Sequence, residues 1–168
     1  MSISMYQASV PVFQRQLGNL DLILDKAAAW AESRKIEGSV LVTARLAPDM
    51  FTLARQVQIA TDNAKGATAR LAGVAPPKFE DNEASFADLK ARIAKTLSFI
   101  GGISAAQIDG SENREITLSA GPRELHFKGQ AYLLEFAMPN FYFHYSMTYA
   151  ILRHNGVDVG KTDFLGRS

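Results

Sequence analysis

The sequence contains no cysteine, and this absence removes several kinds of chemistry at once. Disulfides, thiolate metal sites and a thiol nucleophile are all excluded, so a metal site would have to use imidazole and carboxylate ligands. The chain also lacks an uninterrupted apolar run of membrane-spanning length. Its start, MSISMYQASVPVF, lacks the basic segment and apolar core of a signal peptide. We therefore expect a cytoplasmic protein with no membrane partner.

An excess of either charge is missing as well. The 18 basic and 17 acidic residues give a net charge of +1, and neither sign gathers into runs. The basic residues form no stripe interleaved with aromatic residues, so nucleic acid is not an expected partner. No serine stands in a G-x-S-x-G setting, and no glycine-rich phosphate loop follows a strand. The pattern thus argues against a serine hydrolase and a nucleotide-binding enzyme.

What the sequence does contain is helical periodicity. The chain has 168 residues, of which 47% are hydrophobic, which suits a single domain over residues 1–168 with a substantial core. Apolar residues recur at alternating steps of three and four in each of four stretches, as in the helices of a bundle. These stretches lie at about 9–34, 48–73, 85–102 and 130–155. They predict an all-α four-helix bundle.

Three connecting segments have their own patterns. Two short alternating runs, EITLS and RELHFK, are separated by Ala120-Gly121-Pro122 and predict a small β-hairpin between the third and fourth helices. Residues 39–46 are too apolar for a loose loop, so we expect a short extended piece packed against the bundle. Residues 74–85 contain Pro76-Pro77 and predict an extended linker, which suits two helices that are not simple hairpin neighbours.

The fourth predicted helix carries the candidate site. From Leu133 onward a helical stripe runs through Phe136, Asn140, Phe143, Met147, Ala150 and His154. An asparagine on a buried stripe needs a hydrogen-bond partner. His144 follows Asn140 by one turn, so both side chains can point to one place. Pro139 precedes them and predicts a break in the middle of this helix, because proline has no N–H to continue the hydrogen-bond ladder.

Two interpretations of this site stay open. Gln56 on the second helix is the polar residue best placed to face Asn140 and His144, with Asp62 further along. The three side chains can satisfy one another as a hydrogen-bonded cluster, and the amides would bind a metal weakly. Alternatively, His144 is a ligand of Zn or Ni. The cluster is the favoured interpretation, with no cofactor and a small-molecule ligand as a possible occupant of the pocket.

The other histidines and the aromatic residues point to structural roles. His154 falls near a helix end, where it complements the negative helix terminus, and His126 is expected to face solvent or a cross-strand partner. Aromatic residues surround the fourth helix on several sides, as in a core or a subunit interface. They are Phe141, Tyr142, Phe143, Tyr145 and Tyr149. We therefore expect a homodimer.

Two long segments also resemble a known family. ARLAPDMFTLARQVQIATDNAK (residues 44–65) and PNFYFHYSMTYAILRHNGVDVGKTDFLG (residues 139–166) are similar to the domain-of-unknown-function family 1993. That family resembles the DinB-like (YfiT-like) superfamily, whose four-helix bundles are regarded as metalloenzymes. The resemblance implies an up-down-down-up bundle, often dimeric, and a superfamily that includes thiol-dependent transferases.

The resemblance also implies where a metal would bind. The superfamily site uses one histidine on the second helix and an H-x-x-x-H pair on the fourth. In this sequence His144 matches the second histidine of the pair, whereas Asn140 and Gln56 stand at the other two positions. We therefore expect a degenerate metal site that holds a small ligand or forms a structural cluster. The alternatives are a metal-dependent transferase that uses His144, and a purely structural module whose aromatic helix makes the dimer.

Overall fold

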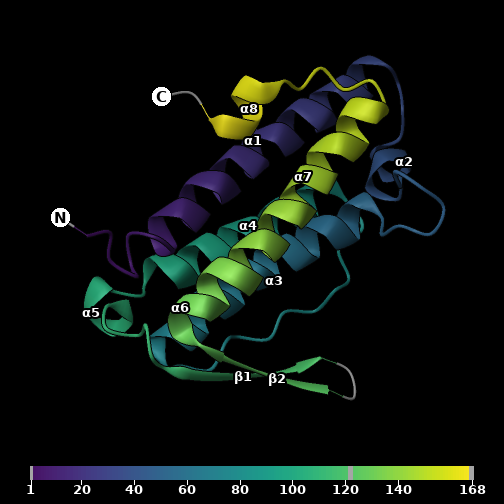
Figure 1. Ribbon diagram of the computed structural model, residues 1–168. Coiled ribbons are helices and arrows are strands. Elements are labelled where there is room, and N and C mark those ends of the chain that lie inside the picture. Colours follow the sequence, from purple (N-terminus) through teal and green to yellow (C-terminus); the bar gives the residue numbers. More distant parts are fainter. Residues whose placement is uncertain (1, 121–122, 167–168) are drawn as a thin grey trace.

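Four long helices lie side by side and form most of the structure (Figure 1). They are α1 (Val10–Ser33), α3 (Leu53–Ala72), α4 (Phe86–Gly101) and α7 (Met138–His154). The computed structural model describes residues 2–120 and 123–166. Shorter helices are α2 (Gly38–Val42), α5 (Ala105–Ile108), α6 (Gly129–Ala131) and α8 (Lys161–Leu165). The predicted helical class with a small antiparallel hairpin is confirmed.

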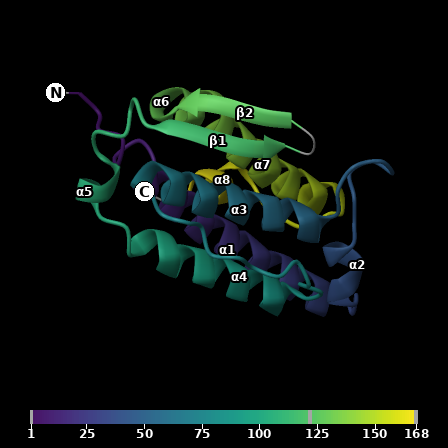
Figure 2. The ribbon, with the colours of Figure 1, turned by 90° about the horizontal axis from the view of Figure 1, so that it is seen from below.

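The long helices enclose one hydrophobic core. α3 packs against both α7 and α4, while α1 packs against α4 and carries α8 on its outer side (Figures 1 and 2). Leu17, Val57, Ile93 and Phe141, one from each long helix, are completely buried in the same cluster. Each such side chain stabilises the fold by about 1.5–3 kcal/mol relative to exposure to water. The three-four spacing of the sequence therefore identified the buried faces of the first three long helices.

Side-chain capping sets where the helices begin and end. The hydroxyl of Thr52 accepts a hydrogen bond from the Arg55 amide at 3.3 Å, so α3 begins at Leu53. The prediction that this helix opens at Pro48 was wrong by more than a turn. Gly73 ends α3 in the left-handed conformation (φ 71°), as predicted. Ser85 caps α4: its hydroxyl oxygen accepts from the Asp88 amide, and the Asp88 carboxylate accepts from the Ser85 amide.

The predicted extended piece at residues 39–46 is also wrong. Residues Gly38–Val42 form the one-turn helix α2. Leu41 and Val42 are both buried although they are neighbours in the chain. Adjacent residues of a strand point to opposite faces, whereas a helical turn can present neighbouring side chains to one core. The helical turn is therefore the conformation that buries both.

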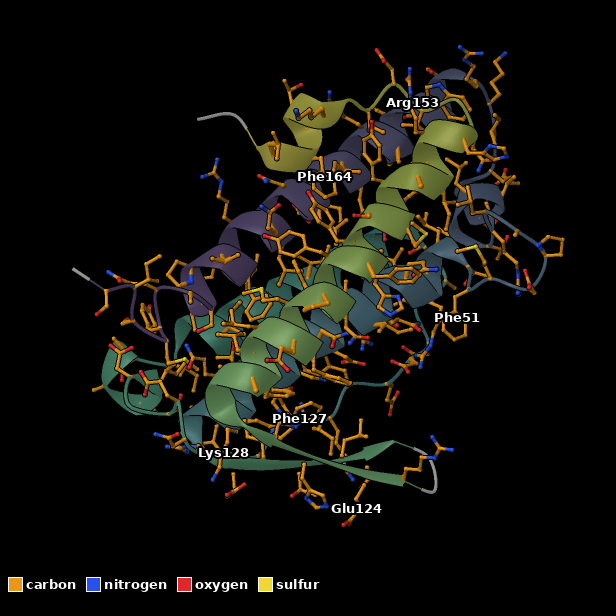
Figure 3. The ribbon with its side chains drawn as sticks, in the orientation of Figure 1. Phe51, Glu124, Phe127, Lys128, Arg153 and Phe164 are labelled. Carbon is orange, nitrogen blue, oxygen red and sulfur yellow. The ribbon has the colours of Figure 1, made fainter. Side chains whose placement is uncertain are left out.

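Strands β1 (Glu115–Ala120) and β2 (Arg123–Lys128) form the predicted hairpin. Its turn, Gly121-Pro122, lies outside the described residues. Phe127 points from β2 toward the helices and packs on Phe136 at a centroid distance of 5.3 Å, whereas Glu124 points away (Figure 3). His126 is exposed, and its Nδ1 lies 3.1 Å from the hydroxyl of its cross-strand partner Thr117.

The helix that carries the candidate site does not end at Pro139. Helix α6 continues through a π-helical turn, η1 (Tyr132–Ala137), directly into α7. Pro139 lies in the first turn of α7, where its missing N–H is tolerated. The predicted interruption therefore takes the form of a change in helix type just before the proline. A π-helical turn bonds each residue to the fifth one along, so it contains one residue more than an α-helical turn.

This extra residue moves the buried stripe of α7. The stripe predicted from Leu133 was wrong downstream, since Phe143 is 53% exposed and His154 is exposed. From Phe136 to Ala150 of the predicted stripe, the buried positions lie one residue later. They are Ala137, Phe141, His144, Thr148 and Ile151. The shift moves His144 onto the buried face and leaves Asn140 half-buried.

Candidate polar site between helices α3 and α7

Gln56 and His144 meet between the first turn of α3 and the middle of α7. Nδ1 of His144 lies 2.7 Å from Oε1 of Gln56, and the two residues are 9% and 1% exposed. The amide nitrogen of Gln56 donates to the carbonyl of Phe51 at 3.4 Å, which directs Oε1 toward the imidazole. Because an amide oxygen only accepts, Nδ1 of His144 must carry the proton and donate it. The lone pair of the neutral ring is therefore on Nε2.

Nε2 of His144 is in contact with solvent. Within residues 2–120 and 123–166 this nitrogen has no hydrogen-bond partner, and it is not fully buried. The ring of Phe143 lies edge-on to the imidazole, with centroids 5.2 Å apart. Phe143 and Phe51 are each 53% exposed, and Figure 3 shows Phe51 beside the start of α3. The imidazole thus has the apolar ring of Phe143 against it, and its Nε2 can accept a hydrogen bond.

The surroundings keep this imidazole uncharged. Burial lowers the pKa of His144 below its ordinary value, and the positive charge of Arg55 lowers it further. The neutral ring can accept a hydrogen bond or a proton at Nε2. It is less suited to binding an anion, because the charged form is disfavoured.

Asn140 is placed differently from the expectation. Its amide nitrogen donates to the carbonyl of Phe136, one turn earlier, at 2.7 Å. The hydrogen bond that its position requires is therefore made within its own helix. The structure brings Gln56 and His144 into contact, and it leaves Asn140 as a neighbour one turn before His144.

The donor atoms of this site do not fit a catalytic metal ion. They comprise one imidazole and two neutral amides, and Zn or Ni sites without cysteine rely on several imidazoles and carboxylates. In the part of the chain that the structure describes, no three histidine or acidic side chains gather in one place. The charge of Arg55 would further oppose a cation here. Asp62 is also committed elsewhere, to Lys65 and Arg92 at 2.8 Å each.

An ion-pair network around Arg92 was missed by the sequence reasoning. The side chain of Arg92 on α4 is 1% exposed, and it contacts three carboxylates. These belong to Asp62 (2.8 Å), Glu83 (2.9 Å) and Asp81 (3.0 Å). Burial alone would lower the pKa of Arg92, but the hydrogen bond to Glu83 and the nearby carboxylates raise it above its ordinary value. Two features of the sequence could have revealed this network. Arg92 follows Leu89 by three residues on a buried stripe, and the acidic run of residues 80–83 lies shortly before this helix.

The fold and the site define a mostly helical protein with a neutral polar pair where two long helices meet. The sequence profile of DUF1993, a domain of unknown function, matches residues 5–165, and the chain belongs to this family. Its structure is similar to the crystal structure of a DinB family member protein from Shewanella denitrificans, with a TM-score of 0.89 and 44% sequence identity. The similarity covers 97% of this chain and 92% of that one. No curated protein matches the chain.

The comparisons agree with the resemblance seen in the sequence, so the protein is DinB-like. In the part of the chain that is described, no helix has the length and apolar character needed to cross a membrane. The other histidine of the fourth long helix, His154, is exposed in the last turn of α7 beside Arg153, where basic side chains complement the negative helix end.

Proposed function

We propose that residues 1–168 form one DinB-like domain, a four-helix bundle of up-down-down-up topology. The arrangement of neighbours supports this topology, because α3 packs mainly on α4 and α7 while α1 packs mainly on α4. The long connection at residues 74–85 provides the chain length that such a crossover needs. A cytoplasmic location remains our prediction.

Within this bundle, we infer that Gln56, Asn140 and His144 form a degenerate metal site that works without a metal ion. The observation that carries this inference is the 2.7 Å contact between Nδ1 of His144 and Oε1 of Gln56. It joins α3 to α7, and it leaves the lone pair of the neutral ring on Nε2, with the ring of Phe143 edge-on to the imidazole. We propose that a small neutral ligand with an N–H or O–H donor binds there. A metal-dependent transferase is the alternative, but one imidazole and two neutral amides are poor ligands for Zn or Ni.

Replacing His144 with Ala should lower the free energy of unfolding by about 1–3 kcal/mol, because the buried oxygen of Gln56 loses its donor. Urea denaturation at pH 7.5 measures this loss. His154→Ala is the matched control, since it removes an exposed histidine of the same helix and should change stability by less than about 0.5 kcal/mol. Zn or Ni should not raise the melting temperature of the wild type. A rise that disappears in His144→Ala would support the metal enzyme instead.

The pH dependence of stability tests the protonation of the His144 imidazole separately from its packing. Since the folded-state pKa of His144 is lowered, the unfolded chain binds a proton more readily. The stabilisation is therefore present above the ordinary histidine pKa and is lost as pH falls through the lowered folded-state value. Between pH 7.5 and 5, wild type should lose more stability than His144→Gln. The exposed His126→Gln variant should follow the wild type, and parallel curves for all three proteins would contradict this assignment.

We also propose a homodimer that associates through the exposed side of α7. Phe141 and Tyr145 belong to the core, where Phe141 packs on Phe13 at 5.1 Å, but Phe143 remains 53% exposed. Light scattering at micromolar concentration should give about twice the chain mass of 18.4 kDa. Phe143→Ser should yield the monomer. Leu22→Ser, at a 64% exposed position of α1, is the control and should remain dimeric. A monomeric wild type would remove the proposal.

A further inference from the structure

A groove runs along the second half of α3, away from Gln56. Figure 2 shows α3 between the hairpin on one side and the connection of residues 74–85 on the other. Two hollows of about 610 and 220 Å³ occupy this region, and they adjoin at Asp62 and Arg70. Pro76, Pro77 and Phe79 line the larger one. Leu118, Tyr132 and Phe136 line the smaller one.

Arg70 is held in a fixed position at the junction of the two hollows. Its Nη1 donates to the hydroxyl of Tyr132 at 3.1 Å. The guanidinium lies against the backbone of Gly66, since a Cβ at that position would come within 2.4 Å of Nη1. Burial raises the pKa of Tyr132 despite the opposing charge of Arg70, so the hydroxyl keeps a proton to donate.

The carboxylates that line the groove are already neutralised. Asp62 pairs with Lys65 and Arg92, at 2.8 Å in both cases. Asp81 pairs with Arg92 at 3.0 Å and also with Arg55. Neither acid therefore leaves a net negative charge in the larger hollow.

Two cations that line the groove, Arg70 and Lys78, are not matched in this way. Across the described ranges, 2–120 and 123–166, no carboxylate lies within ion-pair distance of Arg70 or Lys78. A guanidinium offers five donors in a planar fork, and Tyr132 accounts for one interaction. An acid group is the natural partner of the remaining donors.

We propose that this groove binds a small organic anion, with its carboxylate on Arg70 and its apolar body against Pro77 and Phe79. The polar end and the apolar walls follow the usual construction of small-molecule sites, where a few placed polar groups orient an apolar ligand. The π-helical turn η1 forms one wall through Tyr132 and Phe136, and such turns occur often at functional sites. This site is separate from Gln56 and His144, so either proposal can fail without the other.

The test uses 2-naphthoate as the probe and its neutral analogue 2-naphthylmethanol as the matched ligand. Calorimetric titration should show saturable binding of 2-naphthoate, at least about tenfold tighter than that of the alcohol. Arg70→Gln should weaken 2-naphthoate by at least about tenfold and leave the alcohol unchanged. Gly66→Ala should also weaken it, because the new methyl group displaces the guanidinium while keeping its charge.

Lys95→Gln and His154→Gln, both at exposed positions, are the control variants and should bind 2-naphthoate as the wild type does. Amide shift mapping should place the ligand at Gly66 and Ser119, even if Arg70→Gln folds poorly. Absence of saturation up to about 5 mM would overturn the proposal. Equal affinities of wild type and Arg70→Gln, or shifts centred on His144, would overturn it as well.

Discussion

Replacing Arg92 with Met should lower the free energy of unfolding by about 3–5 kcal/mol. Methionine keeps most of the side-chain volume, so this loss does not come from a cavity. It comes mainly from the carboxylate of Glu83, which would lose its cation, since Asp62 would keep Lys65 and Asp81 would keep Arg55. The side chain of Glu83 is only 9% exposed and would suffer most. Native domains are stable by only about 5–15 kcal/mol, so the variant should be close to unfolding.

Lys95→Met is the matched control for this experiment. Lys95 lies on the same helix, one turn after Arg92, and is exposed. Its replacement should change stability by less than about 0.5 kcal/mol. Urea denaturation measures both variants. A loss below about 1 kcal/mol for Arg92→Met would mean that the connection at residues 74–85 is held by its apolar contacts alone.

The effect of Arg92→Met should also depend on pH. Burial raises the pKa of Asp81, but hydrogen bonds and charges from Arg55 and Arg92 outweigh it and lower the pKa. The folded state therefore binds the proton of Asp81 less readily than the unfolded chain does. This contribution is complete above about pH 5 and is lost as pH falls through the lowered pKa. The gap between wild type and variant should accordingly be constant from about pH 8 to 5 and shrink below about pH 4.

The Arg92 network shows what periodicity alone does not reveal. Local signals were sufficient for α1, for the start of α4 near residue 85 and for the hairpin, since each depends on residues close in the chain. Arg92 depends on Asp62, thirty positions earlier, and on acidic residues of a connection whose course was predicted only as extended. Recognising Asp81 and Glu83 as partners required knowing that residues 80–83 return over α4.

The prediction of which α7 residues are buried was wrong for a different physical reason. The three-four count from Leu133 assumed α-helical geometry throughout, and η1 adds one residue before the count reaches His144. The error placed Phe143 in the core, whereas its side chain is 53% exposed; His144, which was expected to be buried near the second helix, is buried. The pairing of Gln56 with His144 was nevertheless anticipated, because it came from polar residues on facing helices rather than from the stripe.

The largest gain in stability should come from zinc binding to a variant with histidines at the two positions that the family resemblance assigns to metal ligands. A Gln56→His, Asn140→His double variant would place three imidazoles around one point, since position 56 already contacts His144 and position 140 lies one turn before it. A ligand that binds only the folded state stabilises it by mass action, by about 2.7 kcal/mol at one hundred times its dissociation constant. We therefore expect zinc to raise the melting temperature of the double variant by several degrees.

The single variants and the wild type serve as controls, because one or two imidazoles bind zinc weakly. Adding His144→Ala to the double variant should abolish the shift. Equal shifts in the double variant and the wild type would mean that positions 56 and 140 are not the equivalents of the family ligands. A zinc-dependent shift confined to the double variant would show that the helices still present these positions to one point. In that case the native Gln56–His144 hydrogen bond has taken the place of a metal ion in joining α3 to α7.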